Sequence, residues 1–366
     1  MRINFFIGSV DLLLSLLGFC YYRYQLPWGR STLFTLGYVL LTINAIFSRS
    51  LSPLLPHALV KASAWLEGLW VAFGYYTLLF SIIHLVLWLL SKLIHINLPF
   101  GKIALITLVA SCLTVTFGSL RAFTPVVRTE EILTSKLPAG TSYRLVLLSD
   151  VHLGRILGRS YAQQLVQRVN HLEPDAVLIA GDLIDEKIAY VEAENSLEAL
   201  SHFRAPKGVY LAFGNHEYID NPLRWQQLVE AHGIKVLVNA STIIDGQLKI
   251  TGLNDFRYSK GKSPKAIKAL ARENDKYYSV LMDHQPRRMR GAAQLGYDLY
   301  LSGHTHTGQL FPNRQITKRM YQLDYGRKEF GQLTAITSSG YGFWGPPVRT
   351  EKEPEIVLIT VKGTAK

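Results

Sequence analysis

Four long apolar stretches dominate the first 120 residues of this 366-residue chain. A helix needs about 20 consecutive apolar residues, within a range of about 17–25, to cross the hydrocarbon layer of a bilayer. Three of the stretches reach that length, and the second is at its short end. The stretches are 3–22, 32–47, 64–90 and 103–120. The sequence therefore predicts an all-α membrane domain of about four transmembrane helices over residues 1–120.

The density of charged residues also changes near residue 120. Residues 1–120 carry seven of the 39 Lys and Arg and two of the 27 Asp and Glu, whereas the rest has the composition of a soluble domain. Asp11, Glu67 and His84 interrupt the apolar stretches, and we interpret them as structurally paired side chains. If the spans are even in number, six Lys and Arg flank the membrane on the side of the soluble domain and four on the other. By the positive-inside rule, this split favours a cytoplasmic soluble domain.

From about residue 129, short apolar stretches alternate with helical patterns. Apolar strands that alternate with helices are typical of sheets buried on both faces. Polar residues follow the carboxyl ends of the strands, where open α/β sheets bind ligands. The predicted strands are 144–148, 176–180, 208–213, 248–253, 278–282, 299–301, 335–338 and 356–361, and the predicted helices are 161–172, 191–203 and 223–232. The lysine-rich stretch 261–276 is expected to form a solvated helix face.

Five short polar motifs follow these strands and combine carboxylates, imidazoles and one amide. That mixture suits divalent metals such as Mn, Fe, Zn or Co, and it lacks the thiolates of a structural zinc site. Pairs two residues apart, such as Asp150 and His152, can send both side chains to one face. A glycine before three of the polar residues lets the backbone approach a ligand closely. Each motif alone is more often a turn, but their joint occurrence indicates a metal centre. The motifs are Asp150-Val151-His152, Gly181-Asp182, Gly214-Asn215-His216-Glu217, His284 and Gly303-His304-Thr305-His306.

The chain from about residue 140 to its end resembles the calcineurin-like metallophosphoesterase superfamily, and within it the bacterial membrane-associated branch. Leu148-Ser149-Asp150-Val151-His152 and Gly303-His304-Thr305-His306-Thr307-Gly308-Gln309 carry the resemblance. It implies an α/β sandwich, two sheets flanked by helices, over residues 143–366, with a linker and first strand at 121–142. Related branches resemble UDP-diacylglucosamine pyrophosphatases and other envelope phosphodiesterases. The first 120 residues resemble no family.

The resemblance also implies a dinuclear centre of two divalent ions bridged by Asp182. His216 would lie beside the metals without binding them, and would protonate the leaving oxygen or stabilise the phosphoryl charge. The family often has Asp where this chain has Glu217, and we expect either carboxylate to orient His216 and raise its basicity. Asn215 would contact both a metal and the substrate. One metal would be held by Asp150, His152 and His306, and the other by Asn215, His284 and His304.

A Gly- and Pro-rich loop at 338–349 carries Tyr341, Phe343 and Trp344. Two interpretations stay open. The aromatic side chains either cover an edge of the core, or the loop forms a lip near the metals. In the second case Arg349 would bind a substrate phosphate, since a guanidinium suits bidentate phosphate contact, and Trp344 would meet an acyl chain or the bilayer.

A metal pair tethered to a membrane domain predicts hydrolysis of a phosphoester or pyrophosphate on a lipid-linked or envelope substrate. We expect an integral, multi-pass protein of the bacterial inner membrane. The net charge of +12 favours an anionic surface or substrate. No basic block or aromatic-basic motif points to nucleic acid, so a nuclease is only an alternative. Another alternative is a metal-binding membrane receptor or scaffold without activity, and a transporter ranks last because few polar residues interrupt the spans.

Overall fold

The computed structural model describes residues 2–259 and 264–365, so part of the lysine-rich stretch 261–276 lies outside the described residues. The chain divides into two compact units. The helical unit comprises Met1–Ala122 together with Gly345–Thr350. The sheet unit comprises Phe123–Trp344 and Glu351–Lys366. The grouping of Gly345–Thr350 with the helices was not expected from the sequence.

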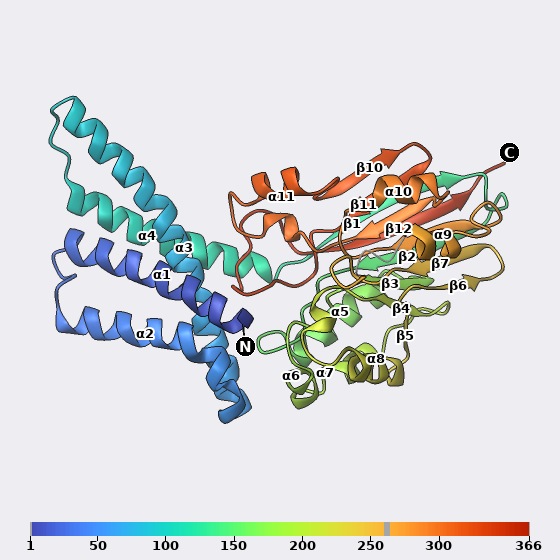
Figure 1. The fold of residues 1–366 in the computed structure, drawn as a ribbon, viewed down its shortest axis with the longest axis horizontal. Coiled ribbons are helices and arrows are strands. Elements are labelled where there is room, and N and C mark those ends of the chain that lie inside the picture. The colour runs from blue at the N-terminus through green and yellow to red at the C-terminus, as the bar shows by residue number, and fades with distance from the viewer. Residues whose placement is uncertain (1, 260–263, 366) are drawn as a thin grey trace. The chain divides into compact units, whose positions relative to one another are not determined.

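Long helices form the helical unit (Figure 1). Three helical segments, 32–54, 57–93 and 100–122, are long and apolar enough to cross a membrane. The helix over the first predicted stretch is also formed, although its first side chains lie outside the described part, and the count of about four spans stays a prediction. The helices of the described part are α1 (Arg2–Gln25), α2 (Thr32–Leu51), the 3-10 turn η1 (Ser52–Leu54), α3 (His57–Leu93) and α4 (Phe100–Ala122).

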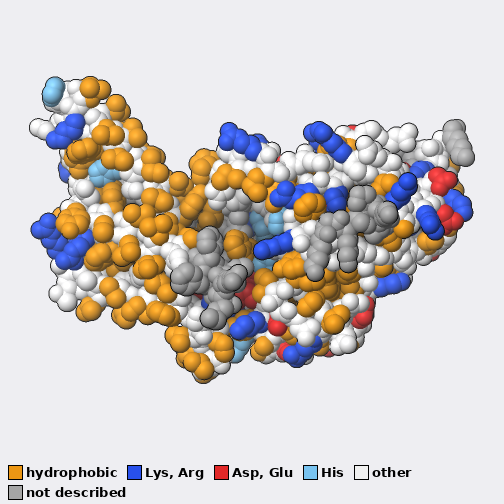
Figure 2. Space-filling model, viewed as in Figure 1, with side chains coloured by type: hydrophobic (Ala, Val, Ile, Leu, Met, Phe, Trp, Pro, Cys, Tyr) orange, Lys and Arg blue, Asp and Glu red, His pale blue; other side chains and the backbone are white. Residues whose placement is uncertain are grey.

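Apolar side chains cover the surface of this unit (Figure 2). Leu33 and Leu120, for example, are 83% and 69% exposed. Contiguous apolar surface is rare on soluble monomers and is typical of contact with lipid. Two of the polar residues inside the unit have the structural partners that we expected. Glu67 forms an ion pair with Arg49 at 2.8 Å, and His84 Nδ1 contacts the hydroxyl of Tyr21 at 2.5 Å.

Two mixed sheets, each of six strands in the described part, form the sheet unit (Figure 1). Their strand orders are β1-β12-β2-β3-β4-β5 and β10-β11-β9-β8-β7-β6. The first sheet contains β1 (Val126–Thr134), β2 (Ser142–Leu148), β3 (Ala176–Ala180), β4 (Val209–Ala212), β5 (Ile234–Val236) and β12 (Glu355–Gly363). The second contains β6 (Ala240–Ile244), β7 (Leu248–Gly252), β8 (Tyr278–Met282), β9 (Leu299–Ser302), β10 (Gly326–Phe330) and β11 (Leu333–Thr337).

The main core lies between the two sheets. Leu145 and Leu147 of β2 meet Val280 of β8 and Leu301 of β9 in one buried cluster. The alternate side chains of these strands face outward, where helices cover them, as Tyr300 does beside Met289. This explains why the strands are continuously apolar, and it confirms the predicted sandwich of two sheets flanked by helices. The flanking helices are α5 (Arg159–His171), α6 (Ile188–Ala193), α7 (Ser196–Leu200), α8 (Pro222–Ala231), α9 (Pro264–Leu270), α10 (Met289–Gln294) and α11 (Arg314–Met320).

The predicted single helix over 191–203 is wrong. The chain forms α6 and α7 there, separated at Asn195, which has a φ of +49°. A left-handed residue cannot continue a right-handed helix, and Asn is one of the few side chains that tolerate this conformation.

Candidate metal centre

All the predicted metal ligands lie just beyond the carboxyl ends of strands. β2, β3 and β4 are parallel neighbours in the first sheet, and β8 and β9 are parallel neighbours in the second. Their ends therefore bring the following loops together. Asp150 and His152 follow β2, Asp182 follows β3, Asn215 and His216 follow β4, His284 follows β8, and His304 and His306 follow β9.

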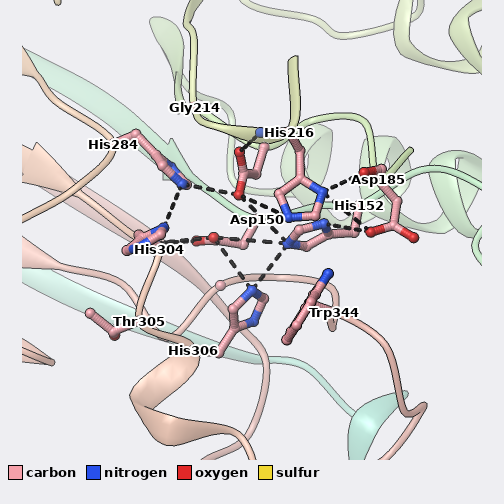
Figure 3. A network of polar contacts seen from close by, with 12 residues as sticks. Asp150, His152, Asp185, Gly214, His216, His284, His304, Thr305, His306 and Trp344 are labelled. Atoms are coloured by element: carbon pink, nitrogen blue, oxygen red, sulfur yellow. Dashed lines mark hydrogen bonds and ion pairs between the residues drawn. The ribbon is translucent and has the colours of Figure 1, made fainter. Parts of the chain in front are cut away.

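Most of these side chains converge on one another (Figure 3). They form three overlapping groups, and within each group the candidate ligand atoms lie within 4.8 Å of one another. Asp182 belongs to two of the groups, as a bridging ligand would. The groups are Asp150, His152 and His306; His152, Asp182 and His216; and Asp182, His284 and His304.

Several close contacts between these side chains join atoms that carry lone pairs. Nε2 of His152 lies 3.0 Å from Nε2 of His306, which in turn lies 3.5 Å from Oδ1 of Asp150. Nε2 of His284 lies 3.0 Å from Oδ2 of Asp182. Nitrogen and carboxylate donors that converge in this way suit borderline divalent cations.

Surrounding contacts also favour metal binding. Nδ1 of His284 lies 2.8 Å from the carbonyl oxygen of Ala180, so its N–H can donate there and leave Nε2 with a lone pair for a metal. Burial lowers the pKa of His304 to about 3, which keeps this imidazole in the neutral, metal-binding form. Oδ1 of Asn215 is buried and accepts no hydrogen bond from any residue that the structure describes. These residues therefore fit a pair of divalent ions.

The backbone of the centre is strained. Asp150, His152, Asp182, His304 and His306 all have φ between +45° and +71°. A left-handed conformation costs a non-glycine residue on the order of 1–3 kcal/mol, and such residues cluster at functional sites. The sheet unit thus maintains an unfavourable backbone to direct these side chains toward one another.

The glycines of the motifs are required by close approach. A Cβ on Gly214 would lie 2.2 Å from Oδ1 of Asp182, and one on Gly303 would lie 2.2 Å from Oδ2 of Asp150. Neither position can accept a side chain without moving a predicted ligand. Close approach to these two carboxylates explains why both positions are glycine.

His216 lies beside the candidate ligands and contacts two carboxylates. Its backbone N–H donates to Oδ1 of Asp182 at 2.9 Å. Its ring Nδ1 contacts the backbone carbonyl of Asp185 and lies 3.5 Å from the Asp185 carboxylate. Burial alone would lower the pKa of His216, but Asp182 and Asp185 outweigh it, and the pKa is raised. His216 therefore favours its protonated form, as a proton donor requires.

Asp185 was missed in the sequence. Its carboxylate also lies 3.2 Å from Nδ1 of His152, so it contacts both a predicted metal ligand and the predicted proton donor. The available signal was its position three residues after Asp182, which keeps it within the same short loop beyond β3.

The expected role of Glu217 holds in part: its charge is among those that raise the pKa of His216, but its carboxylate oxygens accept backbone N–H groups instead of contacting the His216 ring. Its carboxylate is buried and accepts backbone N–H groups from Asp182 at 3.0 Å, Leu183 at 2.7 Å and Gly214 at 2.7 Å. Glu217 thus ties the loop after β3 to the loop after β4, and Asp185 rather than Glu217 contacts the ring of His216.

The 338–349 loop buries two of its three aromatic side chains, and its role as a lip near the metals stays a prediction. Tyr341 and Phe343 are buried, whereas Trp344 is 47% exposed and its ring centroid lies 6.4 Å from that of His216. Arg349 is fully buried and groups with the helical unit. Its contact with a substrate phosphate stays a prediction.

Comparisons with known proteins agree with this fold. Residues 143–308 match the Calcineurin-like phosphoesterase family. The chain is 33% identical over 239 residues to an uncharacterized metallophosphoesterase of Aquifex aeolicus, which covers 63% of this chain and 89% of that protein. An uncharacterized metallophosphoesterase of Campylobacter jejuni is 35% identical over 224 residues, which cover 60% of this chain and 59% of that protein.

A third relative is named a transmembrane protein with metallophosphoesterase domain, from Danio rerio. It is 32% identical over 276 residues, which cover 70% of this chain and 62% of that protein. This chain belongs to the calcineurin-like metallophosphoesterase family, whose members use a dinuclear divalent metal centre. It spans about three-fifths of the length of the Campylobacter and Danio relatives.

Proposed function

We propose that this chain is a membrane-anchored hydrolase that cleaves a phosphoester or pyrophosphate bond at a pair of divalent cations. The observation that carries the proposal is that Asp182 belongs to one group with His152 and His216 and to another with His284 and His304. Asp150, His152 and His306 would hold one cation, and Asn215, His284 and His304 the other. The metal identity, for which manganese is our first choice, is part of the proposal.

The side chains divide the work of hydrolysis between them. Two divalent ions, when bound, would neutralise phosphate charge and make water a competent nucleophile near neutral pH. The water oxygen adds to phosphorus as the bond to the leaving oxygen breaks, and His216 gives its proton to that oxygen. The proton that the water loses passes to solvent, from which His216 is protonated again. Asp185 holds the His216 ring and supports its protonated form. Asn215 contacts the substrate as well as the metal.

The proposed substrate is lipid-linked. Three apolar helices support membrane association, as do relatives named transmembrane proteins with a metallophosphoesterase domain. The half-exposed Trp344 beside His216 offers an apolar surface next to the reacting phosphate.

By the distribution of Lys and Arg, we place the sheet unit on the cytoplasmic side of a bacterial inner membrane. The test is Gln315→Cys, a change at an exposed position, in a chain from which Cys20 and Cys112 have been removed. A membrane-impermeant thiol reagent should label this cysteine only after cell lysis.

Hydrolysis is tested on the full chain in detergent with Mn²⁺ and bis-p-nitrophenyl phosphate. Asp182→Ala and His216→Ala should each lower kcat by at least about 10²-fold, whereas His202→Ala, which changes an exposed histidine, should retain activity. Stoichiometric Mn²⁺ binding without hydrolysis of any phosphoester would instead support the receptor or scaffold. A polyprenyl pyrophosphate in mixed micelles should give a kcat/KM at least tenfold above that of the soluble diester. Equal values would remove the lipid-linked substrate from the proposal.

A further inference from the structure

The guanidinium of Arg287 has no carboxylate partner among the residues that the structure describes. Its Nε donates to Oε1 of Gln285 at 3.2 Å, but no described group accepts a hydrogen bond from Nη1 or Nη2. The neighbouring Arg288 differs, because its Nε and Nη2 bind the two carboxylate oxygens of Asp283 at 2.7 and 2.5 Å. Taking a charge out of water is costly unless it is paired, so the half-buried Arg287 suits an anion from outside the chain.

Two aromatic rings hold this guanidinium in place. Cζ of Arg287 lies 4.5 Å from the ring centroid of Tyr321 and 5.6 Å from that of Phe256. The backbone is also fixed, since Nε2 of Gln322 donates to the carbonyl oxygen of Arg287 at 3.0 Å. Contact with ring faces leaves the N–H groups of a guanidinium available to a ligand, because they lie in its own plane. The side chain is therefore ordered before any ligand binds, which favours binding.

Tyr321 also contacts the candidate metal centre. Its ring centroid lies 5.7 Å from that of His304, a predicted metal ligand. Burial is the main reason that the pKa of His304 is lowered, and the positive charge of Arg287 adds to this effect. The guanidinium thus lies within electrostatic reach of the centre, and Arg287 follows another predicted ligand, His284, by three residues. A substrate held by the metals would reach it with a second anionic group.

We propose that Arg287 binds the second phosphoryl group of a pyrophosphate substrate while the metal pair holds the group that reacts. The inference rests on the proposed function and narrows it from phosphoesters in general to the pyrophosphate bond. A guanidinium offers two parallel N–H donors to phosphate oxygens, and Nη1 and Nη2 are available here. A simple diester has no second phosphoryl group, so Arg287 distinguishes the two kinds of substrate.

Arg287 would also assist the departure of the leaving group. Water adds to one phosphorus, the bond from that phosphorus to the bridging oxygen breaks, and His216 protonates the bridging oxygen. A diesterified pyrophosphate is thereby converted into two phosphomonoesters. Negative charge increases on the leaving phosphate as the bond breaks, and a fixed cation beside that phosphate stabilises the charge.

The test compares two substrates in the full chain in detergent with Mn²⁺. They are diphenyl pyrophosphate, with one phenyl group on each phosphate, and bis-p-nitrophenyl phosphate. Arg287→Gln should lower kcat/KM for the pyrophosphate about tenfold, as expected for a lost hydrogen bond to a charged group, and at least about fivefold more than for the diester. The control Arg290→Gln removes an exposed cation from the same segment and should keep both values within about twofold of the wild type. Equal losses on both substrates in Arg287→Gln, or no loss on either, would overturn the proposal.

Two further variants separate the charge of Arg287 from its geometry. Arg287→Lys keeps the charge but loses the paired donors, so it should retain part of the preference for the pyrophosphate. Phe256→Ala removes a ring that is 45% exposed and contacts the guanidinium. It should lower the preference in the same direction by a smaller amount, and it decides the question if Arg287→Gln does not fold.

Equilibrium binding separates this proposal from the proposed function. If the wild-type chain hydrolyses neither substrate, the proposed function fails, and calorimetry with diphenyl pyrophosphate still tests Arg287. Weaker binding in Arg287→Gln than in the wild type would support the anion site, whereas equal binding would overturn it. A wild-type chain that cleaves bis-p-nitrophenyl phosphate but not diphenyl pyrophosphate would retain the proposed function and overturn the pyrophosphate substrate.

Discussion

Replacing Glu217 by alanine should destabilise the sheet unit strongly, although Glu217 is not a predicted metal ligand. Its carboxylate accepts three buried backbone N–H bonds of 2.7–3.0 Å from two loops. A buried donor without a partner costs about 1–3 kcal/mol. Removing the buried charge recovers part of that cost, so we take the lower end and expect a loss of about 3 kcal/mol. For a unit of this size, that loss lowers Tm by about 6–12 °C.

The assay is differential scanning calorimetry of the full chain in detergent with EDTA, so that metal release does not contribute. Glu217→Asp keeps both oxygens on a shorter side chain and should fall between the wild type and Glu217→Ala. Glu230→Ala, which removes an exposed carboxylate from α8, is the control and should leave Tm within about 1 °C. A Glu217→Ala protein with a Tm within about 2 °C of the wild type would refute the assignment of Glu217 as the link between the two loops.

Three further predictions concern the reaction itself. Asp185→Asn should lower kcat by about 10–100-fold and shift the alkaline limb of the pH profile to lower pH, because it removes a charge that raises the pKa of His216. An unchanged profile would contradict the contact between the two residues. The raised pKa of His216 keeps its proton above pH 6.5, so kcat/KM should fall only as pH rises through that raised pKa, and the limb should be absent in His216→Gln. Arg349→Ala should raise KM at nearly constant kcat, and an unchanged KM with a lower Tm would assign this fully buried side chain to structure alone.

The sequence predicted the interior strands well because their burial on both faces leaves a continuous apolar pattern. β2, β3 and β8 follow that pattern. β1 lies within the stretch 121–142 where a first strand was expected, but its bounds could not be predicted, because it is an edge strand whose mostly exposed residues show no such pattern. β10 was missed for the same reason, since its residues Arg327, Lys328 and Glu329 are exposed.

The candidate centre could be predicted because each ligand follows a strand directly, so that sheet order alone brings the motifs together. The contacts around the ligands could not be predicted in the same way. Glu217 and Asp185 both follow ligands at short spacing, and only the three-dimensional path of the loops decides which carboxylate contacts His216 and which binds backbone. The grouping of Gly345–Thr350 with the helices could not be predicted either, because nothing in those residues indicates it.

The most direct test of the shared metal centre is the metal content of the purified full chain, with Mn²⁺ binding measured by calorimetry in parallel. We expect two divalent ions per chain in the wild type, and fewer than two in Asp182→Ala, because that carboxylate lies near His152 in one group and near His284 and His304 in another. A wild-type chain that retains no stoichiometric divalent ion, or an Asp182→Ala chain that still binds two with wild-type affinity, would contradict a shared metal centre at the strand ends.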